Sequence, residues 1–356
     1  MMVEDRIPII IVSYHNSSDV AACLSALSRL TTDPEFSVFV CENGGSAAFD
    51  VLISSLCAPR GPCVRNRPAT GVDLPISRFS RVRRLRLRTT GMRVHVAEAR
   101  ENYGYGAAVN AWLRALRTRS TWPGLWVLDP KALPEPYALA ELVAVAAIRQ
   151  KGMVGSRIVC SRKPEIVVTR GSRWGPYLAS TRAIGRNEPA SVEPNSQRIE
   201  SWLTAPSRIS IYVTRRCLDY IGLMDERYFL YLEDIDWGYR AKKTCGIGYA
   251  HNSVVFRGGT PNMSTGCHSE ASELSIYLHF RNRVNFVRAH CPSWIAWTAL
   301  VLTIRSLKCG INISVALRGL LAGIFGETGR PDRLLKFDGP SLATAAGSSL
   351  RREAPR

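Results

Sequence analysis

Three carboxylates gather in the stretch YLEDIDW, where Glu233, Asp234 and Asp236 stand close together. Apolar and aromatic neighbours of this kind raise the pKa of a carboxyl group. A carboxylate held in such surroundings can act as a general base that takes the proton of an attacking alcohol. The alternative is structural, because acids favour the first turn of a helix and Asp236 can pair with Arg240 one turn later. On this stretch alone, both interpretations stay open.

A second candidate is WVLDPKALP, residues 126–134, an apolar run that ends in an acid, a proline and a base. A buried strand of this kind would deliver Asp129 and Lys131 at its end, which in an α/β protein is the rim of a site. A second acid in place of Lys131 would complete a carboxylate clamp for a hard divalent cation. The lysine therefore indicates either a damaged clamp or a site with different chemistry.

Two further features suit a nucleotide, although each also has a structural explanation. The segment ENYGYGAAVN is a glycine-rich loop that opens a helix, and Gly104 and Gly106 would allow close backbone approach to a phosphate. The same glycines would let a helix and a strand pack closely. Glu42 ends an apolar strand, where α/β sheets often hold a ribose or a base. It could equally cap the following turn.

Alternating strands and helices would bring these residues together. Apolar, β-branched stretches predict buried strands, and stretches with one apolar face predict helices. The expected strands are 7–14, 36–44, 92–98 and 125–129, and the expected helices are 16–30 (capped by Ser17 or Ser18), 101–116 and 135–150 (with Pro136 in its first turn). This order indicates an α/β fold with a doubly wound, mainly parallel sheet. Ligands of such sheets lie at the carboxyl ends of the strands, here Tyr14, Glu42, Asn102 and Asp129.

The second half of the chain is less regular. Strand-like pieces (IVCS, EIVVT, ISIYVT and SVVFR) surround the acid cluster, which is expected to begin a helix. A long helix, ELSIYLHFRNRVNFVRAH, and two apolar helices, WIAWTALVLTIRSLK and SVALRGLLAGIFG, follow. We therefore expect one domain over residues 1–290, apolar or amphipathic helices over 291–337 and a disordered polar tail over 338–356.

The net charge of +18 and the isoelectric point near 9.9 require a polyanionic partner. Nucleic acid, an anionic membrane face and a diphosphate-bearing substrate are all candidates. The segment from Arg60 to Arg93 holds ten arginines and one acid, Asp73, and so carries half of the surplus charge. Its proline and glycine content and weak periodicity predict a basic insertion loop over residues 57–95. Few aromatic residues lie between the arginines, which disfavours a nucleic-acid interface.

Several protein classes are disfavoured by the same sequence. The ten cysteines form no CxxC pair, which favours free thiols in a reducing cytoplasm over a disulfide framework or a metal site. The N-terminus carries Glu4 and Asp5 before its apolar run and does not resemble a signal peptide. No apolar run is long enough to span a bilayer. WIAWTALVLTI (294–304) meets Arg305 and Lys308, which suits either a core helix or a helix that lies on the membrane surface.

Taken in order, these pieces resemble the family 2 glycosyltransferases, inverting enzymes of the GT-A fold, and especially the bacterial rhamnosyltransferase-like branch. The resemblance covers about residues 7–290 and is interrupted by the basic segment. It rests on IIIVSYHNSSDVAACLSAL, VCENGGS, ENYGYGAAVNAWL, WVLDPKALPEPYALAELV, IGLMDERYFLYLEDIDWGYRAKK and YLHFRNRVNFVR. The resemblance implies a Rossmann-like sheet, an acceptor-side half and a C-terminal helical extension.

The resemblance also implies a role for each matched position. The donor nucleotide would contact Ser13, Tyr14, Glu42, Asn102, Gly104, Gly106 and Asp129. Asp234 matches the catalytic base, with Glu233 and Asp236 in support. The implied reaction is the attack of an acceptor hydroxyl on the anomeric carbon of a nucleoside-diphosphate sugar, with inversion and loss of the diphosphate. A positive charge must stabilise the leaving group.

The sequence departs from the family at two positions that would hold a metal ion. Relatives carry an Asn-Pro-Asp or DxD triplet whose last acid binds Mg²⁺ or Mn²⁺, whereas Asp129-Pro130-Lys131 stands here. Arg257 replaces a histidine that many relatives place near the metal. Either Lys131 and Arg257 neutralise the diphosphate directly, or the site has degenerated. A metal recruited by Asp129 alone is a third, less favoured interpretation, because the lysine would oppose it.

The resemblance further implies partners and a location. The donor would be a nucleoside-diphosphate sugar, such as dTDP-rhamnose or a UDP-sugar, and the acceptor a glycan or a lipid-linked glycan of surface polysaccharide synthesis. The enzyme would be cytoplasmic and peripheral on the inner face of the cytoplasmic membrane, bound to its anionic surface. A degenerate GT-A protein that acts as a binding or scaffold subunit is the alternative. A nucleic-acid-binding protein ranks third.

Overall fold

The computed structural model describes residues 6–31, 33–65, 77–117, 122–258, 272–308 and 312–335. The chain divides into two compact units, residues 1–263 and 264–356. The expected tail over 338–356, the N-terminal residues 1–5 and part of the basic segment, residues 66–76, lie outside the described ranges.

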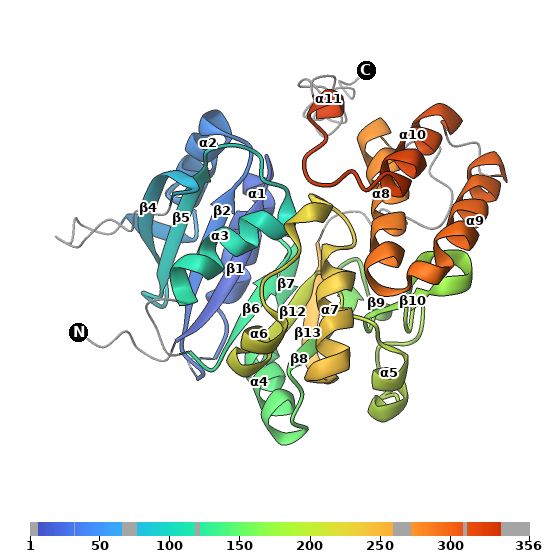
Figure 1. Cartoon of the computed structure of the whole chain (residues 1–356). Helices are drawn as coiled ribbons and strands as arrows, with labels where there is room; N and C mark the ends of the chain where they lie inside the picture. Colours follow the sequence, from blue (N-terminus) through green and yellow to red (C-terminus); the bar gives the residue numbers. More distant parts are fainter. Residues whose placement is uncertain are drawn as a thin grey trace, which may run out of the picture. The chain divides into compact units, whose positions relative to one another are not determined.

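In the described residues of the first unit, one large sheet has the order β3-β4-β5-β2-β1-β6-β12-β8-β13-β7, with β9 paired to β8 (Figure 1). The central strands β5, β2, β1 and β6 are parallel, as the alternating pattern predicts. The strands of this sheet are β1 (Ile7–Ser13), β2 (Phe36–Glu42), β3 (Cys63–Arg65), β4 (Phe79–Leu87), β5 (Arg93–Ala99), β6 (Gly124–Leu128), β7 (Ala132–Pro134), β8 (Met153–Cys160), β9 (Lys163–Thr169), β12 (Ser210–Thr214) and β13 (Ile247–Arg257).

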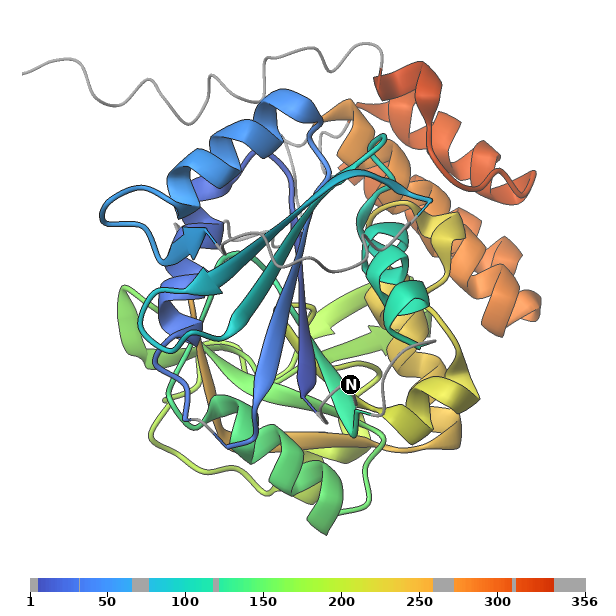
Figure 2. The same ribbon diagram turned by 90° about the vertical axis from the view of Figure 1, so that its left-hand side faces the viewer.

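Helices cover both faces of this sheet, so the prediction of a doubly wound α/β fold is confirmed. Successive residues of β1 face opposite sides, because side chains alternate along a strand. Ile9 and Ile11 pack in one core with α1, α2 and α4, whereas Ile10 and Val12 pack in another with α3, α6 and α7. Figure 2 shows α1 and α2, in blue, on one side of the strands and α3, in teal, on the other. The helices are α1 (Ser17–Leu27), α2 (Ser46–Leu56), α3 (Tyr105–Arg117), α4 (Ala138–Ile148), α5 (Ser196–Trp202), α6 (Arg215–Ile221) and α7 (Glu233–Thr244).

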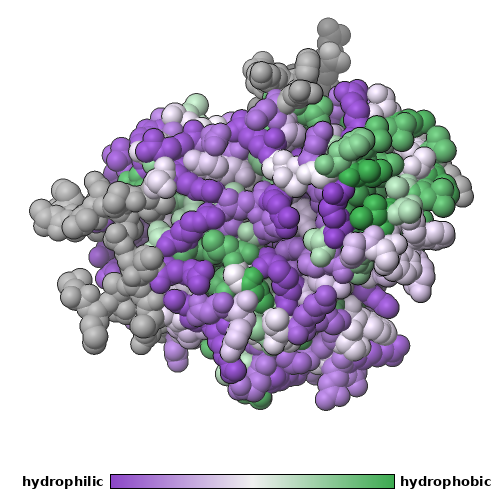
Figure 3. All heavy atoms as spheres, viewed as in Figure 1, coloured by the Kyte–Doolittle hydropathy of each residue, from purple (hydrophilic) through white to green (hydrophobic). Residues whose placement is uncertain are grey.

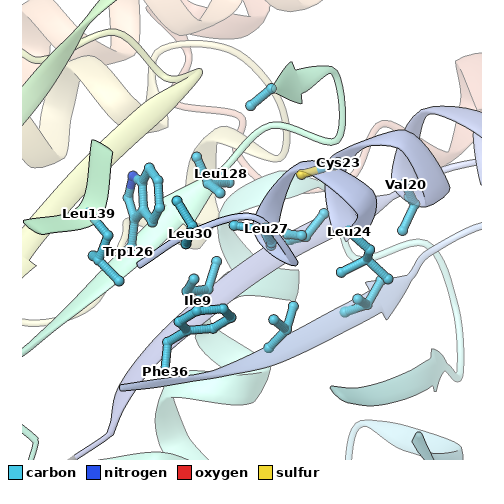
Figure 4. Packing of buried hydrophobic residues seen from close by; sticks show 14 of the residues in the cluster. Ile9, Val20, Cys23, Leu24, Leu27, Leu30, Phe36, Trp126, Leu128 and Leu139 are labelled. Carbon is cyan, nitrogen blue, oxygen red and sulfur yellow. The ribbon is translucent and has the colours of Figure 1, made fainter. Parts of the chain in front are cut away.

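The core beneath α1 explains how the sequence fixes that helix. Val20, Cys23, Leu24 and Leu27 recur at helical spacing and are buried against Ile9 and its neighbours (Figure 4). Each fully buried Leu or Ile contributes about 1.5–3 kcal/mol through loss of apolar surface from water. The start of the helix differs from the prediction, because Asn16 rather than Ser17 or Ser18 is the N-cap residue.

The antiparallel insertion of β12 between β6 and β8 is a feature that the residue pattern does not reveal. Ser210 pairs with Leu128 and Thr214 pairs with Gly124, so β12 begins where β6 ends. Residues just before β12 therefore lie at the carboxyl end of β6. A small separate sheet is formed by β10 (Ser172–Gly175) and β11 (Ser180–Ala183).

The prediction of a basic loop over residues 57–95 is wrong for the described part of that segment. Residues 79–87 form the nine-residue strand β4, which pairs antiparallel with β5. Phe79, Leu85 and Leu87 are buried, Phe79 in the core with α3 and the two leucines in the core with α1 and α2, whereas most of the intervening positions are half-buried or exposed arginines. The arginines hid the buried positions of this strand.

The second unit contains α8 (Glu273–His290), α9 (Ile295–Lys308), α10 (Ile313–Ile324) and the short α11 (Asp332–Leu335). Helix α8, which the sequence analysis assigned to the first domain, groups here with the helices that follow it. A Cβ atom on Gly319 would lie 2.5 Å from the carbonyl oxygen of Tyr277, so glycine permits α10 to approach α8 closely. In the described part of the chain, no helix combines the length and apolarity that a membrane crossing requires.

Candidate active site

The carboxyl ends of β1 and β2 are joined by Glu42, whose side chain is almost completely buried. Its carboxylate contacts the hydroxyl of Ser13 and accepts hydrogen bonds from the backbone N–H groups of Gly44 (2.8 Å) and His15 (3.3 Å). Glu42 thus fixes the two turns that follow these strands. Tyr14, by contrast, is 48% exposed at the end of β1. Of these predicted nucleotide contacts, Tyr14 is the side chain most accessible to a ligand.

Asn43 ties the end of β2 to the glycine-rich loop. Its amide nitrogen donates to the carbonyl oxygen of Gly104 (2.9 Å) and to Oδ1 of Asn102 (3.2 Å). The backbone N–H of Gly104 also donates to Oδ1 of Asn102 at 3.0 Å. The loop that begins α3 is therefore anchored to the sheet at the predicted edge.

Gly104 and Gly106 pack against the acidic segment. Gly104 has a φ of +78°, and a Cβ atom there would lie 2.0 Å from the carbonyl oxygen of Phe229. The same carbonyl accepts the N–H of Tyr105 at 2.8 Å. A Cβ on Gly106 would be 3.5 Å from the Cβ of Glu233. These glycines thus serve the close packing that was one of their two predicted roles, with the acidic segment as the partner rather than a strand.

The segment before α7 has an unusual backbone. Phe229, Tyr231 and Leu232 all have positive φ values, of 63°, 71° and 71°. Such conformations cost non-glycine residues about 1–3 kcal/mol each and persist only where surrounding contacts enforce them. The contact of Phe229 with the glycine loop is one of these. The strained turn places Glu233 and Asp234 in the first turn of α7.

Glu233 and Asp234 form a buried acid pair. Glu233 is only 1% exposed, and neither of its carboxylate oxygens has a hydrogen-bond partner among the described residues. Burial, followed by the charge of Asp234, raises the pKa of Glu233 to about 8. Burial also raises the pKa of Asp234, while Arg208 and the backbone N–H of Ile235 oppose this change. Burial and the charge of Asp234 therefore keep Glu233 protonated at neutral pH.

Arg208 is a cation whose charge acts on both of these acids, and sequence reasoning missed it. Its guanidinium lies 3.8 Å from Oδ2 of Asp129 and 4.8 Å from the centre of the Tyr105 ring. Burial would lower its pKa, but Asp129, Glu233, Tyr105 and Asp234 raise it well above the ordinary value. The residue directly precedes the strand ISIYVT. Its place beside Asp129 follows from the antiparallel pairing of β12 with β6, which the residue pattern does not reveal.

Asp129 and Lys131 lie at the end of β6, as predicted. The backbone N–H of Lys131 donates to Oδ1 of Asp129 at 2.9 Å. The Lys131 side chain is exposed, and its charge lowers the pKa of Asp19 in α1, which burial and Asp129 raise. Asp19 is a second residue that the sequence analysis did not select. Lys131 thus acts on α1 as well as on the end of β6.

Arg257 and Lys131 lie on two neighbouring backbone segments that are joined by a hydrogen bond. Arg257 ends β13, where it pairs with Ala132 of β7, and the N–H of Gly258 donates to the carbonyl oxygen of Lys131 at 2.8 Å. The two predicted cations are therefore carried by neighbouring backbone segments. Among the described residues, the Arg257 side chain has no charge partner as close as the one that Asp129 gives Arg208.

Asp236 belongs to a different set of contacts. Nε of Arg240 donates to its Oδ2 at 2.8 Å, and the hydroxyl of Tyr228 donates to its Oδ1 at 3.4 Å. Arg240 also donates to the carbonyl oxygens of Leu223 (3.0 Å) and Ile221. Asp236 therefore holds the loop before α7 in place, which is the structural role foreseen for a pair with Arg240.

No family model matches the chain, but curated proteins and solved structures do. The chain is 25% identical over 302 residues to N-acetylglucosaminyl-diphospho-decaprenol L-rhamnosyltransferase of Mycobacterium tuberculosis, over 78% of this chain and 85% of that one. It is 23% identical over 252 residues to a low-salt glycan biosynthesis hexosyltransferase of Haloferax volcanii, over 68% and 79%. The structure of GalNAc-T7 with UDP, GalNAc and Mn²⁺ superposes with a TM-score of 0.53 at 13% identity, over 96% of this chain and 58% of that one. The chain is a family 2-like glycosyltransferase of the GT-A fold.

The metal ion implied by this glycosyltransferase family can be tested against the residues present. Among the described residues, no three His, Cys, Asp or Glu side chains gather as a metal site requires. Asp129 is the acid at the expected place, but Oδ1 accepts the N–H of Lys131 and Oδ2 faces Arg208. A divalent cation there would meet the charges of both residues. The described residues of this glycosyltransferase therefore do not fit Mg²⁺ or Mn²⁺.

Proposed function

We propose that the chain transfers a sugar from a nucleoside-diphosphate sugar to a hydroxyl group of a glycan or lipid-linked acceptor, with inversion at the anomeric carbon. The observation that carries this proposal is the buried acid pair Glu233–Asp234, in which Glu233 has no hydrogen-bond partner among the described residues and the charge of Arg208 acts on both acids. Buried polar groups normally have partners, so such a pair indicates a site. The names of the two curated relatives support the same class of reaction.

Asp234 is the proposed general base. Glu233 keeps its proton near neutral pH, whereas the charge of Arg208 and a backbone N–H favour the ionised form of Asp234, so Asp234 is the acid proposed to accept a proton. The acceptor oxygen forms a bond to the anomeric carbon while Asp234 takes the hydroxyl proton. The bond from that carbon to the diphosphate oxygen breaks, and the electron pair leaves with the diphosphate. A single displacement of this kind inverts the anomeric configuration.

The donor nucleotide is proposed to lie at the ends of β1 and β2. Tyr14 offers an exposed ring there, while Ser13, Glu42 and Asn102 shape the turns around it. Asp129 directly follows β6, the strand that pairs with β1. A dTDP- or UDP-linked sugar is the proposed donor, because the rhamnosyltransferase resemblance favours a deoxyhexose.

The test is release of a nucleoside diphosphate from a panel of sugar nucleotides, measured in the presence of an acceptor extract. Asp234→Asn is expected to lower the transfer rate by about 10²–10⁴-fold, since it removes the base. Glu233→Gln keeps the shape and the neutral charge of a protonated carboxyl and is expected to lose about tenfold or less. Asp219→Asn on the surface of α6 is the control. Equal rates for Asp234→Asn and Asp219→Asn would contradict the assignment of the base.

A binding or scaffold protein with a degenerate site is the second candidate. It would keep the fold and lose nucleotide affinity, so calorimetry with UDP, dTDP and GDP separates it from the enzyme. The acid pair disfavours it, because burying the carboxyl group of Glu233 without a hydrogen-bond partner among the described residues costs stability that a scaffold does not require. Nucleic-acid binding is the third candidate and is disfavoured. Arg78 and Arg81 of the basic segment form ion pairs with Glu226 and Glu98, so their charges are already partly neutralised within the chain.

We also propose that the second unit binds an anionic membrane surface on the cytoplasmic side. Two apolar stripes, each at helical spacing, lie exposed on α9 and α10 and form part of the green area in Figure 3. They consist of Trp297, Leu300, Ile304 and Leu307, and of Ile313, Leu317, Leu321 and Phe325. Phe325 is 79% exposed. The net charge of +18 complements anionic lipid, and the mycobacterial relative is named for a decaprenol-linked substrate.

Vesicle flotation tests this surface. Binding to vesicles with anionic lipid is expected to exceed binding to neutral vesicles and to fall with salt. The double variant Leu321→Ser, Phe325→Ser is expected to weaken binding about tenfold or more, because each side chain contributes about 1.5–3 kcal/mol when buried. Val192→Ser, which removes an exposed apolar side chain from the first unit, is the control. A concentration-dependent dimer that the double variant abolishes, without vesicle binding, would assign the stripes to a second copy instead.

A further inference from the structure

We propose that Arg208 binds the diphosphate of the donor and stabilises it as it leaves, in the place where the metal ion of related enzymes would act. The proposal rests on the proposed sugar-nucleotide chemistry of this site. It goes beyond the sequence-based hypothesis, which gave this role to Lys131 and Arg257. It follows from the misfit between Asp129 and a divalent cation.

The backbone fixes Arg208 at the end of β6. The N–H of Asp129 donates to the carbonyl oxygen of Ile209 at 3.0 Å, next in the chain to Arg208. The first residue pair of the two antiparallel strands, Leu128 with Ser210, lies directly beside this bond. Arg208 therefore stands beside Asp129 by construction of the sheet.

The guanidinium is oriented but retains free hydrogen-bonding capacity. It lies over the ring of Tyr105 at 4.8 Å, and its distance of 3.8 Å from Asp129 exceeds that of a hydrogen bond. None of its five N–H donors bonds to another described residue, and one third of the side chain is exposed. Buried or half-buried guanidinium groups usually donate to a partner. The planar donor fork matches the two oxygens of a phosphate group.

The charges around Arg208 suit a leaving diphosphate better than a metal. Asp129 lies 3.8 Å from the guanidinium, and Glu233 and Asp234 are close enough to raise its pKa. When the bond to the anomeric carbon breaks, the electron pair stays on the terminal diphosphate oxygen and adds one negative charge. Arg208 can meet that charge with preformed N–H donors and needs no proton transfer. The proton of the acceptor goes to Asp234.

Lys131 and Arg257 are secondary in this arrangement. Lys131 is exposed, and its charge acts on Asp19 in α1. Arg257 belongs to the next backbone segment and has no ion pair with Asp129. Arg208, by contrast, is coupled to Asp129 and to both members of the acid pair. Arg208 is therefore the cation that can bind the donor diphosphate while its charge acts on the general base Asp234.

Calorimetry with a nucleoside, its monophosphate and its diphosphate tests the proposal. The three ligands are those of uridine, thymidine or guanosine, whichever nucleoside series the wild-type chain binds best. The buffer contains EDTA. Arg208→Gln is expected to weaken diphosphate binding about 10- to 100-fold and to leave nucleoside binding unchanged, since one charge-assisted fork is lost. Arg208→Lys, which keeps the charge and loses the fork, should lie between. Arg182→Gln, on the exposed strand β11, is the matched control.

The outcomes separate this inference from the proposed function. Equal loss of affinity for all three ligands, or unchanged diphosphate affinity in Arg208→Gln, would overturn the role of Arg208. Wild-type diphosphate binding that disappears in EDTA and returns with Mn²⁺ would overturn it as well. Failure of the wild-type chain to bind any nucleotide would overturn the proposed function itself. Thermal melts of each variant show whether an altered affinity reflects misfolding.

Discussion

The guanidinium of Arg208 lies 3.8 Å from Oδ2 of Asp129, across the junction of β6 and β12. This relationship joins two positions that are almost eighty residues apart in the chain. It places a fixed positive charge at the strand end where the resemblance to family 2 glycosyltransferases implies a metal ion. The same guanidinium helps two buried acids to lie side by side. Burial raises the pKa of both Glu233 and Asp234, and the charge of Arg208 opposes that rise.

The first prediction concerns the pH dependence of stability. Folding raises the pKa of Glu233 from 4.5 to about 8, so the folded state favours the protonated carboxyl. The associated stability is fully present below pH 4.5 and is lost as the pH rises through about 8. The denaturant midpoint of the wild-type chain should therefore fall between pH 6 and pH 9. Glu233→Gln, which cannot ionise, should show a smaller fall.

The same titration predicts a decline of activity on the alkaline side. Ionisation of Glu233 near pH 8 would place a second negative charge beside Asp234 and weaken the field that Arg208 offers to a diphosphate. The ratio kcat/KM of the wild type should therefore fall above about pH 8, and Glu233→Gln should remove this fall. An identical alkaline limb in both proteins would assign it to another group.

The extent to which the sequence predicts this site depends on the kind of signal. The strands that end at Ser13, Glu42 and Leu128 are uninterrupted apolar runs, so their burial and order follow from the residue pattern. The fold class and the edge of the sheet that carries the site were therefore predictable. The acid pair was also visible, because its apolar neighbours surround it in the sequence.

Other features depend on tertiary pairing and could not be read in this way. Periodicity does not give the direction of a strand, so Arg208 looked like an ordinary residue before ISIYVT. The arginines of β4 obscured the strand, because composition outweighed the buried positions Phe79, Leu85 and Leu87. Gly104 was assigned to a nucleotide or to packing, and only the position of the Phe229 carbonyl shows the packing partner.

The second prediction concerns Gly104. Gly104→Ala would place a Cβ atom 2.0 Å from the carbonyl oxygen of Phe229, so the strained turn before Glu233 must move. Such a shift near the base can lower the transfer rate about 100-fold. Gly91→Ala is the matched control, because Gly91 also has a positive φ, of +71°, but no atom lies within 4 Å of its added Cβ. That variant should lose about 1–2 kcal/mol of stability and keep its activity.

The third prediction separates Asp236 from its acidic neighbours. Asp236→Asn leaves Arg240 without its charged partner and should lower the free energy of unfolding by roughly 2–4 kcal/mol. Because Asp236 contacts Arg240 and Tyr228, the variant should retain most of its transfer rate when folded. Asp219→Asn, which removes surface ion pairs with Arg215 and Arg117, should cost about 1 kcal/mol or less. A loss of rate in Asp236→Asn as large as in Asp234→Asn, at full stability, would place Asp236 in the chemistry.

The last prediction converts the site to one that accepts a metal ion. In the double variant Lys131→Asp, Arg208→Gln, two carboxylates stand two residues apart and both opposing charges near Asp129 are removed. Hard divalent cations prefer such oxygen ligands, so the variant should bind Mn²⁺ in a titration followed by electron paramagnetic resonance. Its affinity for a nucleoside diphosphate should be low in EDTA and rise about tenfold or more with Mn²⁺.

The single variants provide the controls for this conversion. Lys131→Asp alone keeps Arg208 beside the new acid pair and should bind Mn²⁺ more weakly than the double variant, because the guanidinium opposes the dication. Arg208→Gln alone has only one carboxylate at this place and should gain little. If the wild-type chain binds Mn²⁺ as tightly as the double variant, Arg208 and Lys131 do not exclude the metal, and the cation of this site is a metal ion after all.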